Sequence, residues 1–432
     1  MSAIDRRSFL GLLGVGGASV ALGGCVGESA PAPRSGSTLK AADPGSAKGD
    51  ISYWNHFTGA DERKGFEKVT SGFKKAYPNV NLKVESLPNE DFMTKFTTAV
   101  QSGSVPNAAM VHASRVNDMV GMRGLIDITG PVSGWEGHRD IAAKLLSPFQ
   151  RGGKTYALPV SLFVDWVYYR VDWLKQAGIS AAPRTWSEFR DVAKALTDAK
   201  KGRYGWGMRG GAGGGEAVIK IIRSYNGPLV DANGGPSLDQ AAVETGLEQY
   251  TAPYTQDKSV PPSAPNDGYN QIFQSFLTGR TGMLMHHTGS LQSVSKGLTP
   301  SEQVLTMPMP KSKAEIGWVQ PLANGLMTLD AAESSLAWLQ YWASAKPQGD
   351  FLAATGYFPA STTAQQDGSI AANPMFAAAL KQIEIGNTPE YFKGFQGWQD
   401  NTVLVQAQAV LVGKTTIAEA AKTIVTDFKS TF

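Results

Sequence analysis

The run G-W-G-M-R-G at residues 205–210 fits the G-x-G-x-x-G pattern of dinucleotide-binding proteins, and Asp231 follows where a ribose-binding acid is expected. That pattern binds a dinucleotide only when an apolar strand precedes it and a helix follows. Here the polar run K-K-G-R at 200–203 stands where the strand is needed. We therefore interpret residues 210–215 as a flexible loop on the rim of a cleft.

Other signatures of catalysis or metal binding are weak. The sequence has no G-x-S-x-G elbow, and its five histidines form neither H-x-x-x-H nor H-E-x-x-H. We expect the adjacent His286 and His287 to point to opposite faces of a strand. The carboxylates show no paired spacing, which leaves a glycosidase open. We expect no metal and no cofactor.

Aromatic residues are numerous, with 10 Trp, 13 Tyr and 18 Phe. A sugar presents flat C–H faces and a rim of hydroxyl groups, so its site needs aromatic planes with polar groups around them. Aromatic and polar residues adjoin one another in W-N-H at 54–56, D-W at 165–166, Y-F at 391–392 and W-Q-D at 398–400. This pairing favours carbohydrate binding.

The elements that must position these residues alternate between strand and helix. Strands are expected at 51–54, 80–84 and 108–111, with helices at 61–77 and 92–100 between them. This β-α-β-α-β order is typical of an α/β fold with a mainly parallel sheet. Further on we expect a strand at 163–169, a helix started by the capping box T-W-S-E at 185–188, and helices at 269–277, 336–341, 403–411 and 418–428.

The first residues are typical of an export signal. Arg6 and Arg7 stand in D-R-R-S-F-L at 5–10, which resembles a twin-arginine signal, and a short apolar stretch follows to Leu22. The run L-G-G-C at 22–25 resembles a lipobox, and the chain's single cysteine is its Cys25. We predict a signal peptide at 1–24, lipidation of Cys25, and a flexible, lipid-anchored tether at 25–49 rich in Pro, Gly and Ser.

The rest of the 432-residue chain is long enough for two domains. The formal net charge is +3, without a dense run of Lys and Arg, so no nucleic-acid partner is expected.

The body of the chain resembles the family 1 extracellular solute-binding proteins of ABC importers, the group that includes maltose-binding protein. The resemblance is carried, in order along the chain, by I-S-Y-W-N-H at 51–56, G-K-T-Y-A-L-P at 153–159, W-V-Y-Y-R at 166–170, D-W-L-K-Q-A-G at 172–178, P-R-T-W-S-E-F at 183–189, F-L-T-G-R-T-G-M at 276–283 with Gly289 after it, G-Y-F-P-A at 356–360 and a closing helix from Thr416.

This resemblance implies a type II periplasmic-binding-protein fold, with two α/β lobes around a ligand cleft and hinge crossovers between them. Lobe one takes residues 50–161 and 309–345, and lobe two takes 162–308 and 346–432. It further implies a monomer without enzymatic activity that binds a mono- or oligosaccharide by hinge closure. The protein then hands the sugar to the permease subunits of an importer, on the outer or periplasmic side of the bacterial cytoplasmic membrane.

The resemblance also places the ligand contacts at strand ends that line the cleft. They are His56, Thr58, Glu90, Ser114 and Arg115 in lobe one, Phe163 or Asp165 on the hinge strand, and Arg209, Gly289, Ser290 and Trp398 in lobe two. Two alternatives stay open. One is a secreted carbohydrate-active enzyme, and the other is a binding protein for a metal chelate, a polyamine or a phosphate ester.

Overall fold

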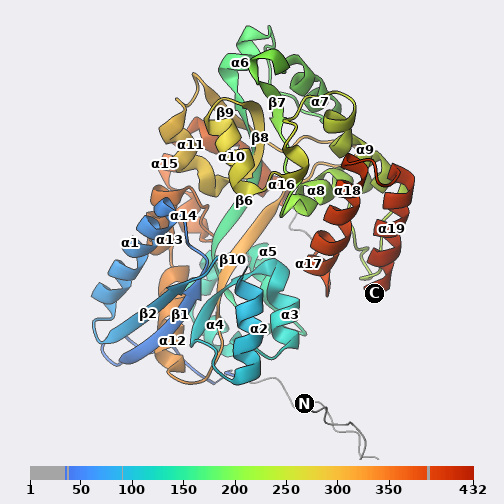
Figure 1. The fold of residues 1–432 in the computed structure, drawn as a ribbon. Helices are drawn as coiled ribbons and strands as arrows, with labels where there is room; N and C mark the ends of the chain where they lie inside the picture. Colours follow the sequence, from blue (N-terminus) through green and yellow to red (C-terminus); the bar gives the residue numbers. More distant parts are fainter. Residues whose placement is uncertain (1–34, 37, 90, 387–389) are drawn as a thin grey trace, which may run out of the picture. The chain divides into compact units, whose positions relative to one another are not determined.

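The computed structural model describes residues 35–36, 38–89, 91–386 and 390–432, which form an α/β fold (Figure 1). The main sheet has the strand order β2-β1-β3-β10-β6-β8-β7, and β9 also pairs with β6. Its strands are β1 (Gly49–Asn55), β2 (Val80–Ser86), β3 (Ala108–His112), β6 (Leu158–Arg170), β7 (Tyr204–Gly207), β8 (Thr281–His287), β9 (Val304–Met307) and β10 (Val319–Leu326). A separate hairpin joins β4 (Gln150–Arg151) to β5 (Lys154–Thr155).

The sheet is mixed, so the prediction of a mainly parallel sheet is wrong. Parallel pairing joins β1 to β2 and β3, and β7 to β8. Around the middle the pairing is antiparallel, because β10 runs opposite to both β3 and β6, and β6 runs opposite to β8 and β9. The sequence pattern missed this because β10 returns from far along the chain.

Strand β6 belongs to both halves of the sheet. Residues 158–164 pair with β10, whereas residues 165–170 pair with β8 and β9. The change of partner falls between Val164 and Asp165. Figure 1 shows β6 and β10 running through the middle of the fold. Phe163 and Asp165 are two residues apart on this strand, and therefore point to the same face.

Helices pack on both halves of the sheet. Those of the first half and its return are α1 (Ala60–Ala76), α2 (Phe92–Ser102), α3 (Val116–Gly121), α4 (Thr129–Ser133), α5 (Ala143–Leu146), α12 (Ala332–Ala343) and α13 (Ala345–Thr355). The others are α6 (Val171–Gln176), α7 (Trp186–Ala195), α8 (Gly214–Asn226), α9 (Gln240–Thr255), α10 (Tyr269–Leu277), α11 (Leu291–Gly297), α14 (Thr362–Gln365), α15 (Gly368–Ala372), α16 (Ala377–Ile385), α17 (Phe395–Gly397), α18 (Leu404–Leu411) and α19 (Ile417–Ser430).

Several predicted helices begin where their caps indicate. The Thr185 hydroxyl accepts a hydrogen bond from the Glu188 backbone N–H at 3.2 Å, and the Glu188 carboxylate accepts one from the Thr185 N–H. Thr416 and Glu419 repeat this capping box at the start of α19. Each box satisfies backbone N–H groups that a helix start leaves free, so it fixes the first turn.

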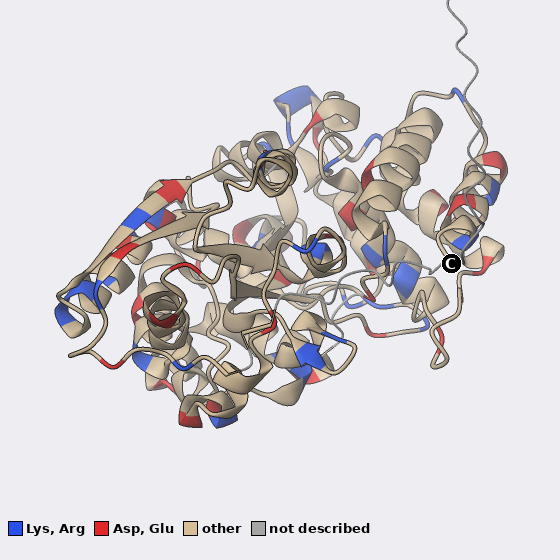
Figure 2. Ribbon diagram, turned by 90° about the horizontal axis from the view of Figure 1, so that it is seen from below, with Lys and Arg blue, Asp and Glu red and all other residues tan. Residues whose placement is uncertain are grey.

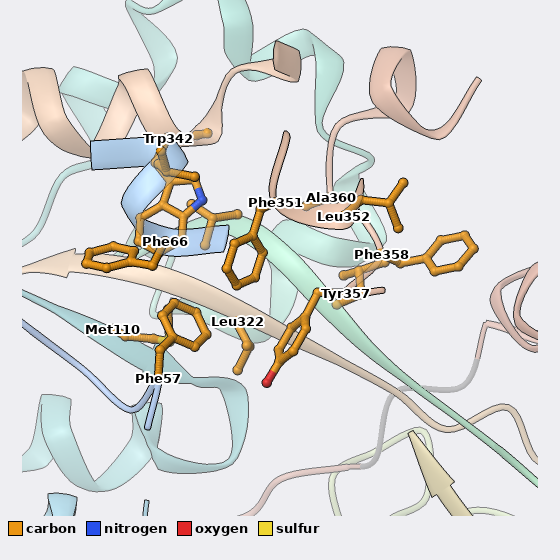
Figure 3. Close-up of a cluster of buried hydrophobic side chains, with 14 of the residues drawn as sticks. Phe57, Phe66, Met110, Leu322, Trp342, Phe351, Leu352, Tyr357, Phe358 and Ala360 are labelled. Carbon is orange, nitrogen blue, oxygen red and sulfur yellow. The ribbon is translucent and has the colours of Figure 1, made fainter. Parts of the chain in front are cut away.

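Large buried aromatic residues fill the core under β1 and α12. Phe57 packs on Phe351 with ring centroids 4.9 Å apart, and Phe66 packs on Trp342 at 5.2 Å. Figure 3 shows these side chains converging with Tyr357. A second core cluster, which includes Trp186, Trp206 and Phe428, lies among α7, α8, α9, α18 and α19.

The described part of the predicted tether packs against the body, which corrects the expectation of a free linker there. The Gly36 N–H donates to the Asp127 carbonyl at 2.9 Å, and the Ala42 N–H donates to the Glu333 carbonyl at 3.0 Å. Ala47 is fully buried. The predicted signal peptide and Cys25 lie outside the described residues.

Two further properties concern the apolar character of the helices and the distribution of charged residues. Among the described helices, none combines the length and apolar character needed to cross a membrane. In the view of Figure 2, Lys and Arg positions are interspersed with Asp and Glu positions.

Candidate functional site

A cavity of about 1080 Å³ lies where the two halves of the sheet meet at β6. Its wall combines the loop after β1, the turn η1 (Ala113–Arg115) after β3, the middle of β6, the start of α8, the end of β8 and the π-helix η8 (Trp398–Val403). Strand ends and helix starts expose backbone groups and short side chains to this space. A cavity of this volume is large enough for a small ligand with several polar groups.

Most of the predicted contact residues line this cavity. They are His56, Thr58, Ser114, Arg115, Phe163, Asp165, Arg209, Gly289 and Ser290. Phe163 and Asp165 both line it, since they share a face of β6. Glu90 lies outside the described residues.

Trp398 is the exception, because its indole is buried in the protein core. Only 3% of its surface is exposed, and its ring packs on Phe428 at 5.2 Å and on Phe392 at 5.7 Å. Its Nε1–H donates to the Ile424 carbonyl at 3.2 Å. The predicted stacking role of Trp398 is therefore wrong. The helical path through α17 and η8 turns its side chain inward, and its near neighbours Gln396, Gln399 and Asp400 line the cavity instead.

Phe163 is surrounded by other rings at the centre of the cavity wall. Its centroid lies 4.6 Å from His287 and 4.7 Å from Tyr357, and about 6 Å from the rings of His56 and His112. His56 Nδ1 lies 3.2 Å from His112 Nε2. Burial lowers the pKa of His56 to about 3 and moves the pKa of His112 in the same direction, so both imidazoles are neutral near pH 7.

The paired histidines of β8 stack on each other instead of pointing to opposite faces. The rings of His286 and His287 lie 4.7 Å apart, and both pack on Tyr269. The strict alternation of a strand no longer holds here because β8 ends at His287 and the turn η6 (Thr288–Ser290) follows. The Tyr269 hydroxyl lies 3.1 Å from His287 Nε2, and Ser290 Oγ lies 2.7 Å from His286 Nδ1.

A buried charged cluster that the sequence does not indicate lies beside Asp165. The Lys220 ammonium contacts the Asp165 carboxylate and lies 2.8 Å from the Glu216 carboxylate. Gln320 donates to Glu216 at 2.7 Å. Burial raises the pKa of Asp165 to about 7, although Lys220 opposes that shift. For Glu216, burial raises the pKa as well, but the charge of Lys220 outweighs it and the net shift is downward.

Two arginines line the cavity, Arg115 from the turn after β3 and Arg209 from the segment after β7. Arg115 is buried, donates to the Asn89 carbonyl at 2.9 Å and lies over the Phe92 ring. Burial lowers its pKa to about 10, and the Asp400 carboxylate opposes that shift. Arg209 donates from Nε to the Ala212 carbonyl at 2.8 Å and lies over the Tyr269 ring. Arg115 remains charged near pH 7.

Several buried polar atoms of the wall have no hydrogen-bond partner among the described residues. They include His56 Nε2, His286 Nε2, Trp206 Nε1 and Trp318 Nε1. Each of these atoms is enclosed by protein, so none of them is open to a ligand in this conformation. Within the described part of the chain, no group of three His, Cys, Asp or Glu side chains is arranged to hold a metal ion. The cavity is also lined by hydroxyl and amide side chains, among them Thr58, Ser114 and Gln320, so the wall suits a ligand that carries many neutral hydrogen-bonding groups.

The glycines of the G-x-G-x-x-G run serve packing. An added Cβ on Gly205 in β7 would lie 1.9 Å from the Ala193 carbonyl oxygen of α7, and one on Gly210 would lie 2.4 Å from the Ala264 carbonyl oxygen. These glycines let the strand and the following turn approach neighbouring backbone closely. Gly213, in the left-handed conformation with φ 77°, then caps the start of α8 and lines the cavity.

Comparison with known proteins relates the chain to a family of binding proteins. Residues 59–349, more than half of the chain, match the sequence model of the family described as bacterial extracellular solute-binding protein. A Brucella abortus protein named as a binding protein is 24% identical over 253 residues, 56% of this chain and 58% of that protein. The mannitol-binding protein of Pseudomonas aeruginosa is 26% identical over 227 residues, 50% of each chain. The matches thus span little more than half the length of these relatives.

The solved structure of the GacH receptor of Streptomyces glaucescens, determined unliganded and with acarbose, is similar in fold. It superposes with a TM-score of 0.81 at 20% sequence identity, over 89% of this chain and 98% of that one.

Proposed function

Since the chain belongs to the bacterial extracellular solute-binding proteins, we propose that it binds a sugar or polyol and delivers it to an ABC importer. The observation that carries this proposal is the cavity wall at β6. Neutral imidazoles, aromatic rings, and hydroxyl and amide side chains surround one space there. The names of the relatives, which mention mannitol and acarbose, support the same ligand class.

We propose two lobes that close on the ligand, with lobe one at 50–161 and 309–345 and lobe two at 162–308 and 346–432. Helix α13, at the start of that last segment, packs on α1 and therefore goes with lobe one. The change of pairing partner along β6 supports a hinge there, because the strand enters one half of the sheet and leaves through the other. Closure would bring Arg115 and Asp400 toward each other across the cavity. The importer's permease would bind the closed form of a monomer.

We propose binding without turnover. A glycosidase needs two carboxyl groups on opposite sides of the scissile bond, about 5–9.5 Å apart, each free to act on substrate. The neighbouring carboxylates Asp165 and Glu216 instead bind one ammonium group, that of Lys220, on one side of the cavity.

A thermal-shift screen of neutral sugars and polyols tests the ligand class. A ligand at one hundred times its dissociation constant is expected to stabilise the protein by about 2.7 kcal/mol. Small-angle scattering with that ligand should show a smaller radius of gyration at constant secondary structure. Phe163→Ala should abolish the shift, whereas Val405→Ala, on an exposed position of α18, should retain it. Stabilisation by polyamines or phosphate esters alone would contradict the proposal.

We further propose that the protein is exported through Arg6 and Arg7 and anchored by a lipid on Cys25. Cys25→Ala is expected to move the protein from the membrane fraction to the soluble fraction with an unchanged melting temperature, because the variant loses only the proposed site of lipid attachment. Cell fractionation measures this, with Ser29→Ala as the matched control. Retention of Cys25→Ala on the membrane would remove the lipoprotein assignment.

A further inference from the structure

The cavity wall contains a small acid pocket formed by Asp165 on β6 and Glu216 on α8. Glu216 and Lys220 are one helical turn apart on α8, so both face β6. Asp165 contacts the same ammonium from the strand side. An i,i+4 pair of this kind is ordinarily solvated, yet here the Lys220 side chain is only 10% exposed and the Asp165 side chain 7%.

All the contacts of Lys220 are internal to the protein. Its ammonium group binds the two carboxylates and lies 5.0 Å from the centroid of the Trp318 ring. Two acids and the face of a tryptophan are what a protein commonly offers to a cationic ligand. Lysine is almost never buried unless it is paired, so the pocket and the ammonium group stabilise each other.

The pocket still has acceptor atoms for a ligand. The contacts of Lys220 and Gln320 use Asp165 Oδ2 and Glu216 Oε1, and the two acids also hydrogen-bond to each other. Each carboxylate oxygen can accept more than one hydrogen bond. The other ionisable groups that face the pocket are Arg209, Tyr269, His286, His287 and Tyr391. Against the effect of burial, the charges of Asp165 and Glu216 raise the pKa of Lys220, so its ammonium stays charged, and His287 is neutral because burial lowers its pKa to about 3.

We infer that Lys220 is a specificity-determining residue, because its ammonium group occupies the acid pocket where a cationic ligand would otherwise place its amine. The cleft then accepts an uncharged, hydroxyl-rich ligand whose O–H groups donate to the carboxylate oxygens of the pocket. A ligand amine finds the pocket filled, and a ligand carboxylate meets two negative groups. The expected natural ligand rests on the proposed function. The occupation of the acid pocket by the Lys220 ammonium does not.

Chemical rescue tests the pocket without a natural ligand. Lys220→Ala leaves space beside two carboxylates, so n-butylammonium at tens of millimolar is expected to raise its melting temperature by about 3 °C or more. Wild type and Lys381→Ala, which removes an exposed lysine of α16, should show no such rise. A rise of equal size in all three proteins, or none in Lys220→Ala, would overturn the inference.

The pH dependence of stability provides a second readout on the same proteins. Without the ammonium, the pKa of both carboxyls rises, and a carboxyl with a raised folded-state pKa stabilises the fold at low pH and loses that effect as the pH increases through it. The melting-temperature deficit of Lys220→Ala should therefore grow from pH 5 to pH 8. Asp165→Asn/Lys220→Ala, with one carboxylate removed, should show little growth. A melting-temperature deficit that stays constant with pH would contradict the role of the Lys220 charge in balancing the two carboxyl groups.

Matched six-carbon ligands test specificity directly. D-Glucitol, D-glucamine and D-gluconate differ at one carbon, which carries a hydroxyl, an ammonium or a carboxylate group. Calorimetric titration of wild type should favour glucitol, and Lys220→Ala should shift the ratio of affinities toward glucamine at least about tenfold. Lys220→Arg should keep the wild-type order, and Lys220→Gln replaces Lys220→Ala if the latter does not fold. Preference of wild type for gluconate or glucamine overturns the inference but not sugar binding, whereas binding of none counts against the proposed function too.

Discussion

Replacing Trp398 by alanine is expected to lower the free energy of unfolding by about 3–5 kcal/mol and to leave ligand affinity unchanged in the folded fraction. The indole is buried among Phe392, Phe395 and Phe428, and its N–H has a backbone partner. Its removal opens a cavity in the core and takes away the additional hydrogen bond that the indole donates to the Ile424 carbonyl. Chemical denaturation measures the loss of stability, and calorimetric titration measures the affinity.

Tyr269→Ala is the matched control for Trp398→Ala. Tyr269 is also an aromatic residue near the ligand cleft, but it is 36% exposed and lines the cavity. Its removal should cost little stability and weaken binding by about tenfold, because the lost contacts are with the ligand and with the histidines of β8. The reverse outcome, with Trp398→Ala stable and deficient in binding, would return Trp398 to the site.

Gly205→Ala is expected to destabilise the protein by about 1–3 kcal/mol or more, because the new methyl group collides with the Ala193 backbone. An added Cβ would lie 1.9 Å from that carbonyl oxygen, and neither β7 nor α7 can move without disturbing the core between them. Thermal unfolding in the absence of ligand measures the effect.

Gly349→Ala is the control, since it also introduces a methyl group at a glycine. Gly349 lies within α13, and an added Cβ there meets nothing within 4 Å. Alanine favours the helix by up to about 1 kcal/mol over glycine, so this variant should be unchanged or more stable. An equally stable Gly205→Ala would mean that the run at 205–210 is not a packing motif.

The sequence predicted the helices and strands of the first half of the chain well, because their apolar spacing and caps are local signals. It failed where the fold depends on distant segments. Nothing near residues 319–326 indicates that this strand enters the sheet between β3 and β6 and makes it mixed.

Some of the cavity residues could be predicted from the sequence, and others could not. His56 and Ser114 were predicted because the resemblance to the solute-binding proteins places contacts directly after strands, and both residues line the cavity. Glu216 and Lys220 were missed because their spacing on a helix resembles an ordinary solvated pair. Trp398 was misassigned because the resemblance places a ligand contact at this position, whereas the local helical path turns the indole into the core. Gly394, with φ 81°, caps α17, and Gly397 lies within that helix.

The insertion of β10 into the sheet has a consequence for the order in which the chain folds. Strand β3 is buried along almost its whole length, and one of its edges is covered only by β10, more than 200 residues later in the sequence. During synthesis that edge stays unpaired, with its N–H and C=O groups open to other strands, until residue 326 is available. The first 160 residues therefore do not make an independent folding unit, and a fragment ending there exposes an edge prone to aggregation. Long-range pairing of this kind also makes folding slow compared with that of a domain built from local contacts.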